Sequence, residues 1–366
     1  MPRVIGVDPG TLSFDVVGLD DGRLFLDATI ATNDLGRTPA VLAELLVAHV
    51  PLDLVAGPSG YGLPLRRADE IGDVEIGLML LSKPGRQSVP DDAAQATIGG
   101  MRRMIAALQA TGLPVVFLPS AIHLPSIPAY CKANKIDMGT ADKVCAAALA
   151  VADQAGRLAC APDQTSFILV ELGGAFSAAL AVAGGRIVDG IGGTSGGPGF
   201  RGSGALDAEL ACLLGDIPKA LLFSAGVRSW HEPAATAPAD LPDDAFAALV
   251  EATLKNVAAL LVSAPAPREL LLSGRFCDDP RLRPALEARL APIAPVRSLG
   301  CLRGCAGKHA AQGAAILADG LVGGPHASIV ASLGLRAARG TVLDYLFVPG
   351  ASAIRARFGL KAEPDR

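Results

Sequence analysis

The pattern of hydrophobic residues is repeated within the chain. A hydrophobic run that ends in an acid and a glycine occupies 4–10 and returns at 167–173, and a Gly-Arg pair follows each run. The matched positions are Asp8 and Glu171, Gly10 and Gly173, Gly22 and Gly185, and Arg23 and Arg186, each pair 163 residues apart (171 − 8 and 186 − 23). Two further apolar runs complete each copy, at 14–19 and 24–30 and at 176–182 and 187–191. The pattern predicts a duplicated three-stranded meander.

Outside these copies the pattern alternates between helix and strand. It predicts helices at 39–49, 141–155, 206–214, 243–262 and 310–315, and strands at 52–56, 115–118 and 269–272. Thr140 is expected to cap the second of these helices, with Asp142 in its first turn. We therefore expect an α/β protein with an N-terminal lobe at 1–140, a connecting helix at 141–157 and a C-terminal lobe at 158–366.

Composition and charge narrow the class of protein. The chain has 366 residues, of which 51% are hydrophobic, enough for two well-filled domains. A net charge of −4, without clusters of lysine and arginine, argues against a nucleic-acid partner. Charged residues and prolines interrupt the long apolar stretches, so no membrane segment is expected. The first strand begins at the fourth residue and leaves no room for a signal peptide, so we expect a cytoplasmic protein.

The seven cysteines are scattered and odd in number, which is not the pattern of a disulfide framework. Cys301, Cys305 and His309 are spaced four apart, which would place three soft ligands on one face of a helix. Three glycines in the same stretch disfavour a continuous helix. The sequence leaves a metal site at this cluster open.

The turn that follows the first strand of each copy carries the residue types of a phosphate and metal site. A glycine just past a strand allows a phosphate to approach the backbone, and successive amides make an anion nest. Asp8 and Glu171 stand at the strand ends, where carboxylate oxygens suit Mg²⁺. Two such turns that face each other would flank one polyphosphate. The expected phosphate ligands are Gly10, Thr11, Ser13, Gly173 and Gly174.

The glycine-rich stretch 190–204 contains a GxGxxG pattern that starts at Gly197. Such a pattern suggests dinucleotide binding when an acid follows a second strand about 20 residues on. Here Asp216 comes directly after a predicted helix, and the strand before the motif is the third of a meander. We interpret the stretch as a ligand-ordered loop in the cleft, where Gly196 and Gly197 contact the cofactor and Arg201 meets an anion.

The order of these features resembles the superfamily of acetate and sugar kinases, heat-shock ATPases and actin. Its five motifs match 8–13, 139–150, 171–174, 272–276 and 312–315, which are the first phosphate, first connecting, second phosphate, adenosine and second connecting motifs. The resemblance covers nearly the whole chain, and within the chain the stretches 57–65, 136–144 and 188–206 are similar to the DUF1464 family of predicted butyrate kinases. The chain departs from the pattern at Glu171, where the superfamily has Asp, and at 171–175, where butyrate kinases have His-Leu-Gly-Gly-Gly.

The resemblance implies a two-lobed actin-like ATPase fold, ribonuclease H-like in each lobe, with ATP and Mg²⁺ in an interlobe cleft. The turn at 140–143 resembles the Gly-Ala-Asp-Arg turn of type III pantothenate kinases. That likeness implies that Asp142 acts with Asp8 in catalysis, either as a base toward the acceptor or by orienting Lys143. The adenosine and second connecting motifs of the superfamily imply four further cofactor ligands, which are Ser273, Gly274, Arg275 and Gly313.

Three functions are consistent with these features. An ATP-dependent kinase with a small acyl or alcohol acceptor is the first, and an ATPase switch that couples lobe closure to a protein partner is the alternative. No specific feature favours the third, an actin-type assembly subunit. The sequence also leaves a homodimer open. The candidate acceptor residues are Ser59, Tyr61, His123, Lys132 and Arg201.

Overall fold

The computed structural model describes residues 1–10, 13–32, 34, 38, 40–82, 102 and 104–361. The chain forms two compact units. Unit 1 comprises Met1–Ile136, Thr140–Asp153 and Cys301–Arg366, and unit 2 comprises Asp137–Gly139 and Gln154–Gly300. This division differs from the expected one, because the chain after Gly300 returns to unit 1 and the predicted connecting helix is shared between the units.

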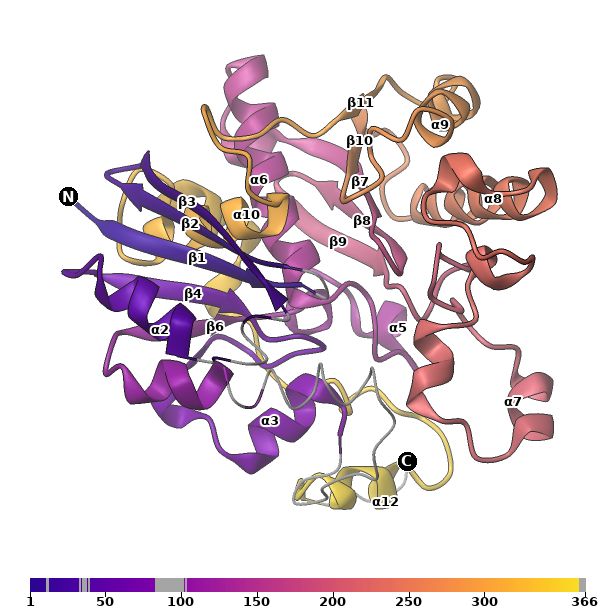
Figure 1. The fold of residues 1–366 in the computed structure, drawn as a ribbon, viewed down its shortest axis with the longest axis horizontal. Coiled ribbons are helices and arrows are strands. Elements are labelled where there is room, and N and C mark those ends of the chain that lie inside the picture. The colour runs from indigo at the N-terminus through magenta and orange to yellow at the C-terminus, as the bar shows by residue number, and fades with distance from the viewer. Residues whose placement is uncertain are drawn as a thin grey trace. The chain divides into compact units, whose positions relative to one another are not determined.

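Unit 1 is built on a six-stranded mixed sheet of order β3-β2-β1-β4-β6-β5 (Figure 1). Its strands are β1 (Arg3–Pro9), β2 (Ser13–Asp20), β3 (Arg23–Ala31), β4 (Leu54–Pro58), β5 (Arg66–Arg67) and β6 (Val115–Leu118). The first three strands form the predicted antiparallel meander, whereas β1, β4 and β6 run parallel. The carboxyl ends of these parallel strands share one edge, where α/β proteins place ligand groups.

Helix α10 (His309–Leu321) explains why the last part of the chain belongs to unit 1. It covers one face of the sheet and contacts β1, β2 and β4 (Figure 1). It also packs on α6 (Ala141–Leu158), where a Cβ added to Gly313 would lie 1.7 Å from the carbonyl oxygen of Cys145. Other described helices of unit 1 are α2 (Ala40–Val47), α3 (Asp73–Leu80), α5 (Ala129–Lys132), α11 (Ala327–Leu333) and α12 (Ala351–Arg357).

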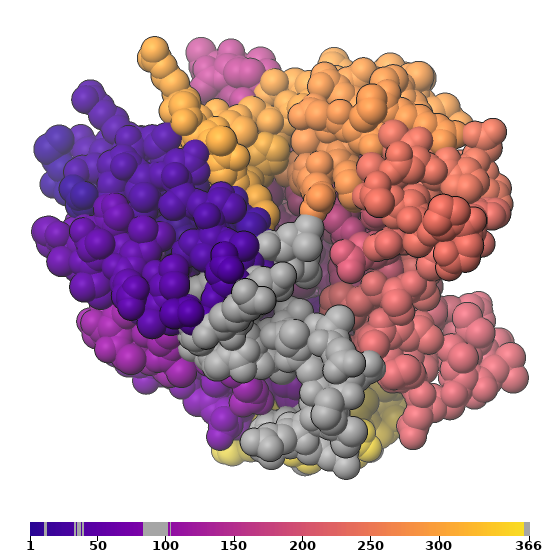
Figure 2. Space-filling model, in the orientation of Figure 1, coloured from indigo at the N-terminus to yellow at the C-terminus, as the bar shows by residue number. Residues whose placement is uncertain are grey.

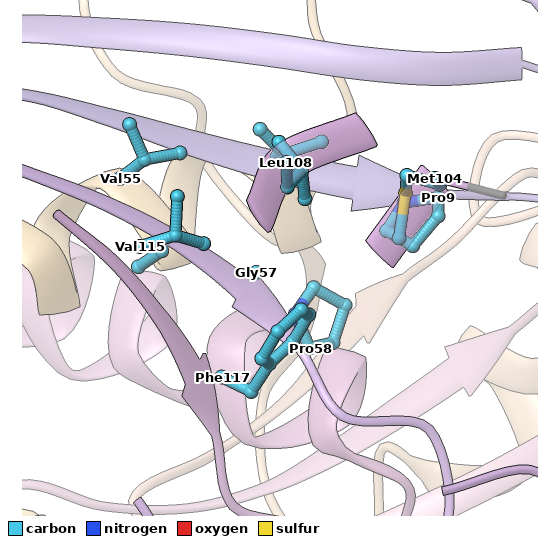
Figure 3. Close-up of a pocket in the computed structure, with 10 residues that line it drawn as sticks. Pro9, Val55, Gly57, Pro58, Met104, Leu108, Val115 and Phe117 are labelled. Atoms are coloured by element: carbon cyan, nitrogen blue, oxygen red, sulfur yellow. The ribbon is translucent and has the colours of Figure 1, made fainter. Parts of the chain in front are cut away.

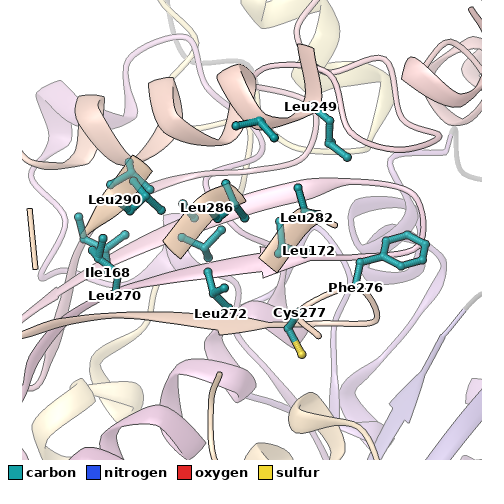
Figure 4. Close-up of a cluster of buried hydrophobic side chains, with 14 of the residues drawn as sticks. Ile168, Leu172, Leu249, Leu270, Leu272, Phe276, Cys277, Leu282, Leu286 and Leu290 are labelled. Carbon is teal, nitrogen blue, oxygen red and sulfur yellow. The ribbon is translucent and has the colours of Figure 1, made fainter. Parts of the chain in front are cut away.

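Unit 2 contains a five-stranded sheet of order β11-β10-β7-β8-β9. Its strands are β7 (Ser166–Leu172), β8 (Ser177–Ala183), β9 (Arg186–Ile191), β10 (Glu269–Ser273) and β11 (Val296–Ser298). Helices α8 (Asp243–Leu260) and α9 (Leu282–Leu290) lie against it, and α7 (Ala208–Leu214) has no buried residue. Ile168 and Leu270 from the sheet pack with Leu286 and Leu290 of α9 in the core of this unit (Figure 4).

The two sheets repeat the same arrangement, which confirms the predicted duplication. In both, an antiparallel meander is followed by two parallel strands on the side of its first strand. The β-bulges at Gly18/Leu19 and Ala181/Val182 are 163 residues apart (181 − 18). The turn hydrogen bonds from Gly10 N to Ser13 O and from Gly173 N to Phe176 O are both 3.0 Å long. The two turns are therefore closed by the same hydrogen bond.

The surface of unit 1 is made by both ends of the chain. Residues near the N-terminus (indigo) and residues after 300 (orange to yellow) both appear in the space-filling view (Figure 2).

No helix among the residues that the structure describes is long and apolar enough to cross a membrane.

Candidate active site

The carboxyl end of β1 carries two neighbouring buried acids. Asp8, the penultimate residue of β1, lies opposite Asp15 of β2, and their side chains are 9% and 6% exposed. The hydroxyl groups of Ser13 and Thr29 donate to the Asp15 carboxylate at 2.9 and 3.1 Å. Asp15 is therefore held in one orientation, two residues beyond the predicted phosphate ligand Ser13.

A lysine from the last third of the chain completes this group. Lys308 directly precedes α10, and its Nζ lies 2.8 Å from Asp15 Oδ2 and 2.6 Å from the carbonyl oxygen of Ser13. The same Nζ is 3.8 Å from Asp8 Oδ2. Sequence reasoning missed both Lys308 and Asp15. An acid within a buried strand was an available signal for Asp15, but nothing local marks a contact between positions 295 residues apart.

The start of α6 contributes another ion pair of unit 1, between Asp142 and Lys143. Asp142 accepts hydrogen bonds of 2.5 Å from Thr140 Oγ1 and from Lys143 Nζ. Burial opposes ionisation of Asp142, but the Lys143 ammonium and these hydrogen bonds outweigh it and hold the pKa of Asp142 below its usual value. Because the charges of Asp142 and Lys143 also act on Asp8, we treat Asp8, Asp15, Asp142, Lys143 and Lys308 as one acid–lysine cluster.

Asp8 is the acid of the acid–lysine cluster with the fewest partners. Within the described part of the chain, no donor lies within hydrogen-bond distance of its carboxylate, and the Lys308 ammonium at 3.8 Å is too far for one. Burial, followed by the negative charge of Asp142, raises the pKa of Asp8 to about 7, against the opposing charges of Lys308 and Lys143. Mg²⁺ binds through one or two carboxylates together with phosphate oxygens and water. A buried carboxylate that lacks donors fits such a cation.

In unit 2, Glu171 takes the position that Asp8 has in unit 1. Its Oε2 is buried and has no hydrogen-bond partner among the residues that the structure describes. Gly274 follows β10 with a φ of +89°, and a Cβ there would lie 2.6 Å from Glu171 Oε1. The orphaned oxygen fits a metal-bound water or a ligand hydroxyl. Ala178 stands opposite Glu171 where Asp15 stands opposite Asp8, so this turn has no counterpart of the Asp15–Lys308 pair.

Unit 2 brings most of its predicted cofactor ligands to one edge of its sheet. Gly173 and Gly174 follow β7, and the turn at 273–275 follows β10, which is parallel to β7. Arg275 is exposed, and its Cδ lies 3.4 Å from a Cβ placed on Gly174. Gly196 and Gly197 instead pack on α8, where added Cβ atoms would lie 2.8 Å from the side-chain atoms of Asn256 and 2.6 Å from Ala252 Cβ.

Two further expected cofactor ligands need separate mention. Gly313 lies inside the contact of α10 with α6, and the lack of space there accounts for the glycine without a ligand. This placement differs from the cofactor contact that the family motif implies. Thr11 lies outside the described residues.

Three of the candidate acceptor residues belong to one polar network in unit 1 or lie beside it. The Ser59 hydroxyl is fully buried and donates to the Leu118 carbonyl at 2.7 Å. The carbonyl of Tyr61 accepts a hydrogen bond from Ser120, whose hydroxyl also lies 2.9 Å from His123 Nδ1. Burial lowers the pKa of His123 to about 4, and its Nε2 has no partner among the described residues.

Lys132 and Arg201 have different surroundings. Lys132 is buried, its Nζ donates to the Leu124 carbonyl at 2.9 Å, and it lies 4.9 Å from the centre of the Tyr345 ring. Burial lowers the pKa of Lys132 to about 8. Its contacts anchor the C-terminal segment of unit 1. Arg201 belongs to unit 2, where its backbone bonds to Ala175. The structure therefore does not group all five candidate acceptor residues.

A small apolar cavity lies under the ends of β1 and β4 in unit 1. Pro9, Gly57 and Phe117 line it on the sheet side, and Met104 and Leu108 cover it (Figure 3). Its volume of about 10 Å³ corresponds to a single water molecule, and an apolar lining of this kind stays dry. A cavity of this volume is too small for a substrate.

The cysteine cluster does not form a metal centre in the described part of the chain, where no three His, Cys, Asp or Glu side chains are arranged to hold an ion. Helix α10 begins only at His309, so the three residues do not share a helix face. A hydrogen bond from His309 lowers the pKa of Cys301, whereas burial raises the pKa of Cys305 to about 11.

Comparisons with known proteins agree with this architecture. The chain matches the family described as "Protein of unknown function (DUF1464)" over residues 6–348. No curated protein matches the chain. A propionate kinase from Francisella tularensis subsp. tularensis SCHU S4 has a similar structure, with a TM-score of 0.58 and 12% identity over 86% of this chain and 98% of that one.

Two acetate kinases are similar to the same degree. The enzyme from Porphyromonas gingivalis has a TM-score of 0.56 and 12% identity over 80% of this chain and 88% of that one. The enzyme from Entamoeba histolytica has a TM-score of 0.55 and 11% identity over 79% of this chain and 86% of that one. At such identities the likeness concerns the fold, and it confirms the predicted actin-like α/β architecture. With the match over 6–348, this chain belongs to the DUF1464 family, and it shares the fold of the acetate and propionate kinases.

Proposed function

We propose that this chain is an ATP-dependent phosphotransferase that acts on a small-molecule acceptor. The observation that carries the proposal is the acid–lysine cluster, which gathers three carboxylates and two ammonium groups at the carboxyl end of β1 beside a glycine turn. Phosphoryl transfer depends mainly on positioning and on charge stabilisation, which such a cluster supplies. The fold shared with acetate and propionate kinases supports the same reading.

The residues divide into two tasks under this proposal. In unit 1, Asp8 holds the magnesium ion of Mg·ATP, and Gly10 and Ser13, with Thr11, contact its phosphates. In unit 2, Gly173 and Gly174 contact phosphate, and the turn at 273–275 contacts the adenosine. Bound magnesium neutralises charge on the phosphate oxygens, which is its usual contribution to this chemistry. The undonated carboxylate of Asp8 and the orphaned Oε2 of Glu171 are the observations that support these assignments.

The state of Asp142 favours a carboxylate acceptor. A general base for an alcohol needs a free oxygen and a pKa near the working pH. Both oxygens of Asp142 are already engaged by Thr140 and Lys143, and its pKa is lowered. A carboxylate acceptor has no proton to lose. Its oxygen attacks the γ-phosphorus, the bond from that phosphorus to the bridging oxygen of ADP breaks, and an acyl phosphate and ADP result. Asp142 then serves to orient Lys143.

An ADP-release assay with panels of short-chain carboxylates, sugars and pantothenate-like alcohols tests the proposal. We expect turnover that depends on a carboxylate and is absent without acceptor. Acceptor-independent ATP hydrolysis would favour the ATPase switch instead, and turnover only with alcohols would overturn the acceptor class. If the protein neither released ADP nor bound nucleotide, the proposed function as a whole would be overturned.

The variant Asp142→Asn separates the two acceptor classes further. With a carboxylate acceptor we expect turnover to fall less than about tenfold, because no proton is transferred, whereas loss of a general base costs about 100-fold or more. Asp163→Asn, an exposed acid in the first turn of the 3₁₀ helix Pro162–Gln164, is the matched control.

A further inference from the structure

We infer that Lys308 is a catalytic residue of this phosphotransferase, the ammonium group that contacts the γ-phosphoryl group of ATP. The inference rests on the proposed function and extends it to a residue outside the sequence motifs. Lys308 lies in the loop between β11 and α10, and the fold brings it to the acid turn of unit 1.

The geometry leaves Lys308 one donor to offer. An ammonium group has three N–H donors. Two are used, by Asp15 Oδ2 at 2.8 Å and by the Ser13 carbonyl at 2.6 Å. Within the part of the chain that the structure describes, the other carboxylate near this Nζ is Asp8, whose Oδ2 at 3.8 Å is beyond hydrogen-bond range. The side chain is 39% exposed, so a ligand can reach the group.

Gly10 shows that the turn is shaped around this ammonium. A Cβ on Gly10 would lie 2.4 Å from Lys308 Nζ and 2.8 Å from the Ser13 carbonyl oxygen. A side chain at this position would displace the ammonium and would also overlap the Ser13 carbonyl oxygen of the backbone. Since the Gly10 amide is already bonded to Ser13 O, the lysine adds a positive charge at a turn whose first amide is occupied.

Hydrogen bonds of the two residues before Lys308 fix where it lies. Before it, the Ala306 amide donates to Asp27 Oδ2 at 2.7 Å, and the Gly307 carbonyl accepts from Gln312 Nε2 at 2.6 Å. Gln312 is itself fully buried in α10. Asp15, held by two hydroxyl groups, then sets the direction of the ammonium and is a positioning residue. The lysine is thus placed before any ligand binds.

The charges of the cluster assign the role. Three carboxylates would repel a polyphosphate unless cations intervene. The Lys143 side chain is paired with Asp142 at 2.5 Å and is 17% exposed, whereas the Lys308 side chain is 39% exposed. The equivalent turn of unit 2 has Ala178 in place of Asp15 and therefore cannot hold a lysine in this way. These differences place the cation for the transferred group in unit 1.

The competing explanation is that Lys308 only ties α10 to the sheet. Calorimetric titration of Lys308→Met with Mg·ATP and with Mg·ADP separates the two. A contact with the γ-phosphoryl group is a charge-assisted hydrogen bond, so we expect ATP binding to weaken about tenfold or more and ADP binding less than about threefold. Equal weakening of both nucleotides, or no change in either, would overturn the inference.

Three controls keep the result interpretable. Lys308→Arg retains the charge, so it should keep most of the preference for ATP and guards against misfolding of the methionine variant. Asp15→Asn should reduce the same preference, more weakly, because it frees the ammonium without removing it. Lys255→Met, at an exposed lysine paired with Glu251 in α8, should leave both affinities unchanged.

The outcomes also separate this inference from the proposed function. A wild-type protein that prefers ATP through Lys308 but transfers phosphate to no acceptor would overturn the transferase and keep the γ-phosphoryl contact. Acceptor-dependent turnover with an unchanged ATP preference in Lys308→Met would keep the transferase and overturn the γ-phosphoryl contact. A wild-type protein that binds neither nucleotide would overturn both.

Discussion

Replacing Asp8 with Asn should stabilise the ligand-free protein at neutral and alkaline pH. In the ligand-free state the Asp8 carboxylate is buried, lies near Asp142 and receives no hydrogen bond from the described residues. Burial therefore disfavours the charged form of Asp8 in the absence of a bound cation. The asparagine has nearly the same shape and carries no charge.

The size of the effect follows from the shift of the pKa of Asp8 from 3.8 to about 7. Because the folded state binds the proton more tightly than the unfolded state, the free energy of unfolding falls as the pH rises from about 4 to about 7. The shift of about 3 units corresponds to about 4 kcal/mol of penalty above pH 7. A buried amide without partners costs about 1–3 kcal/mol itself, so a net gain of about 1–3 kcal/mol is expected.

Urea unfolding of wild type and Asp8→Asn in EDTA, at a series of pH values from 4 to 8, measures this directly. Near pH 4, where Asp8 is protonated in the folded protein, the variant should be less stable by the cost of the amide, about 1–3 kcal/mol. At pH 8 it should be more stable than wild type, with a flatter pH profile. Adding Mg²⁺ with ATP at pH 8 should stabilise the wild type more than the variant, since a ligand of the native state stabilises it by mass action. Asp34→Asn, at an exposed acid, serves as control.

Two results would refute this reasoning. If Asp8→Asn were less stable than wild type at pH 8, the carboxylate would be stabilised by interactions other than those described. If both proteins kept the same slope of stability against pH, the buried charge would not be the cause of that slope.

Three further predictions concern packing, titration and the start of α6. Gly313→Ala should destabilise the fold by several kcal/mol, because its Cβ would overlap the backbone of Cys145, whereas Gly156→Ala in α6 meets open space and should stabilise it by about 0.5–1 kcal/mol; thermal melting compares the two. His123 is neutral when folded, with a pKa of about 4 against 6.5, so stability should be full above pH 6.5 and fall as the pH drops toward 4, and His123→Gln should reduce this acid sensitivity in urea titrations. Thr140→Val should raise the pKa of Asp142 by removing one hydrogen bond, measurable by carboxyl NMR, and an unchanged pKa would contradict the assigned cause.

Local sequence patterns were sufficient for the elements and for the duplication. The strand 115–118 was predicted with the bounds of β6, and α8 and β10 lie where periodicity placed them. The offset of 163 residues, read from acids and glycines, recurs in the bulges and turn hydrogen bonds of the two sheets (181 − 18). These features depend on residues close in sequence, whose side-chain period fixes the local backbone. The family resemblance likewise depends on short segments, and the match over 6–348 confirms the family that they indicated.

The acid–lysine cluster could be read from the sequence only in part. Asp8, Asp142 and Lys143 stood in recognisable turns, and the structure brings them close enough for their charges to interact. The turn residues of unit 2 at 171–174 and 273–275 were also placed together by the parallel pairing of β7 with β10. Their roles toward ATP and an acceptor remain predictions.

Packing between distant segments decided the rest. Lys308 meets Asp15 because α10 buries an apolar face on β1 and β4, which returns the end of the chain to unit 1. The same helix brings Gly313 into contact with α6. Such contacts join residues as far as 300 positions apart (308 − 8). Their partners are selected by shape and buried area across the whole fold, for which one sequence carries no local signal.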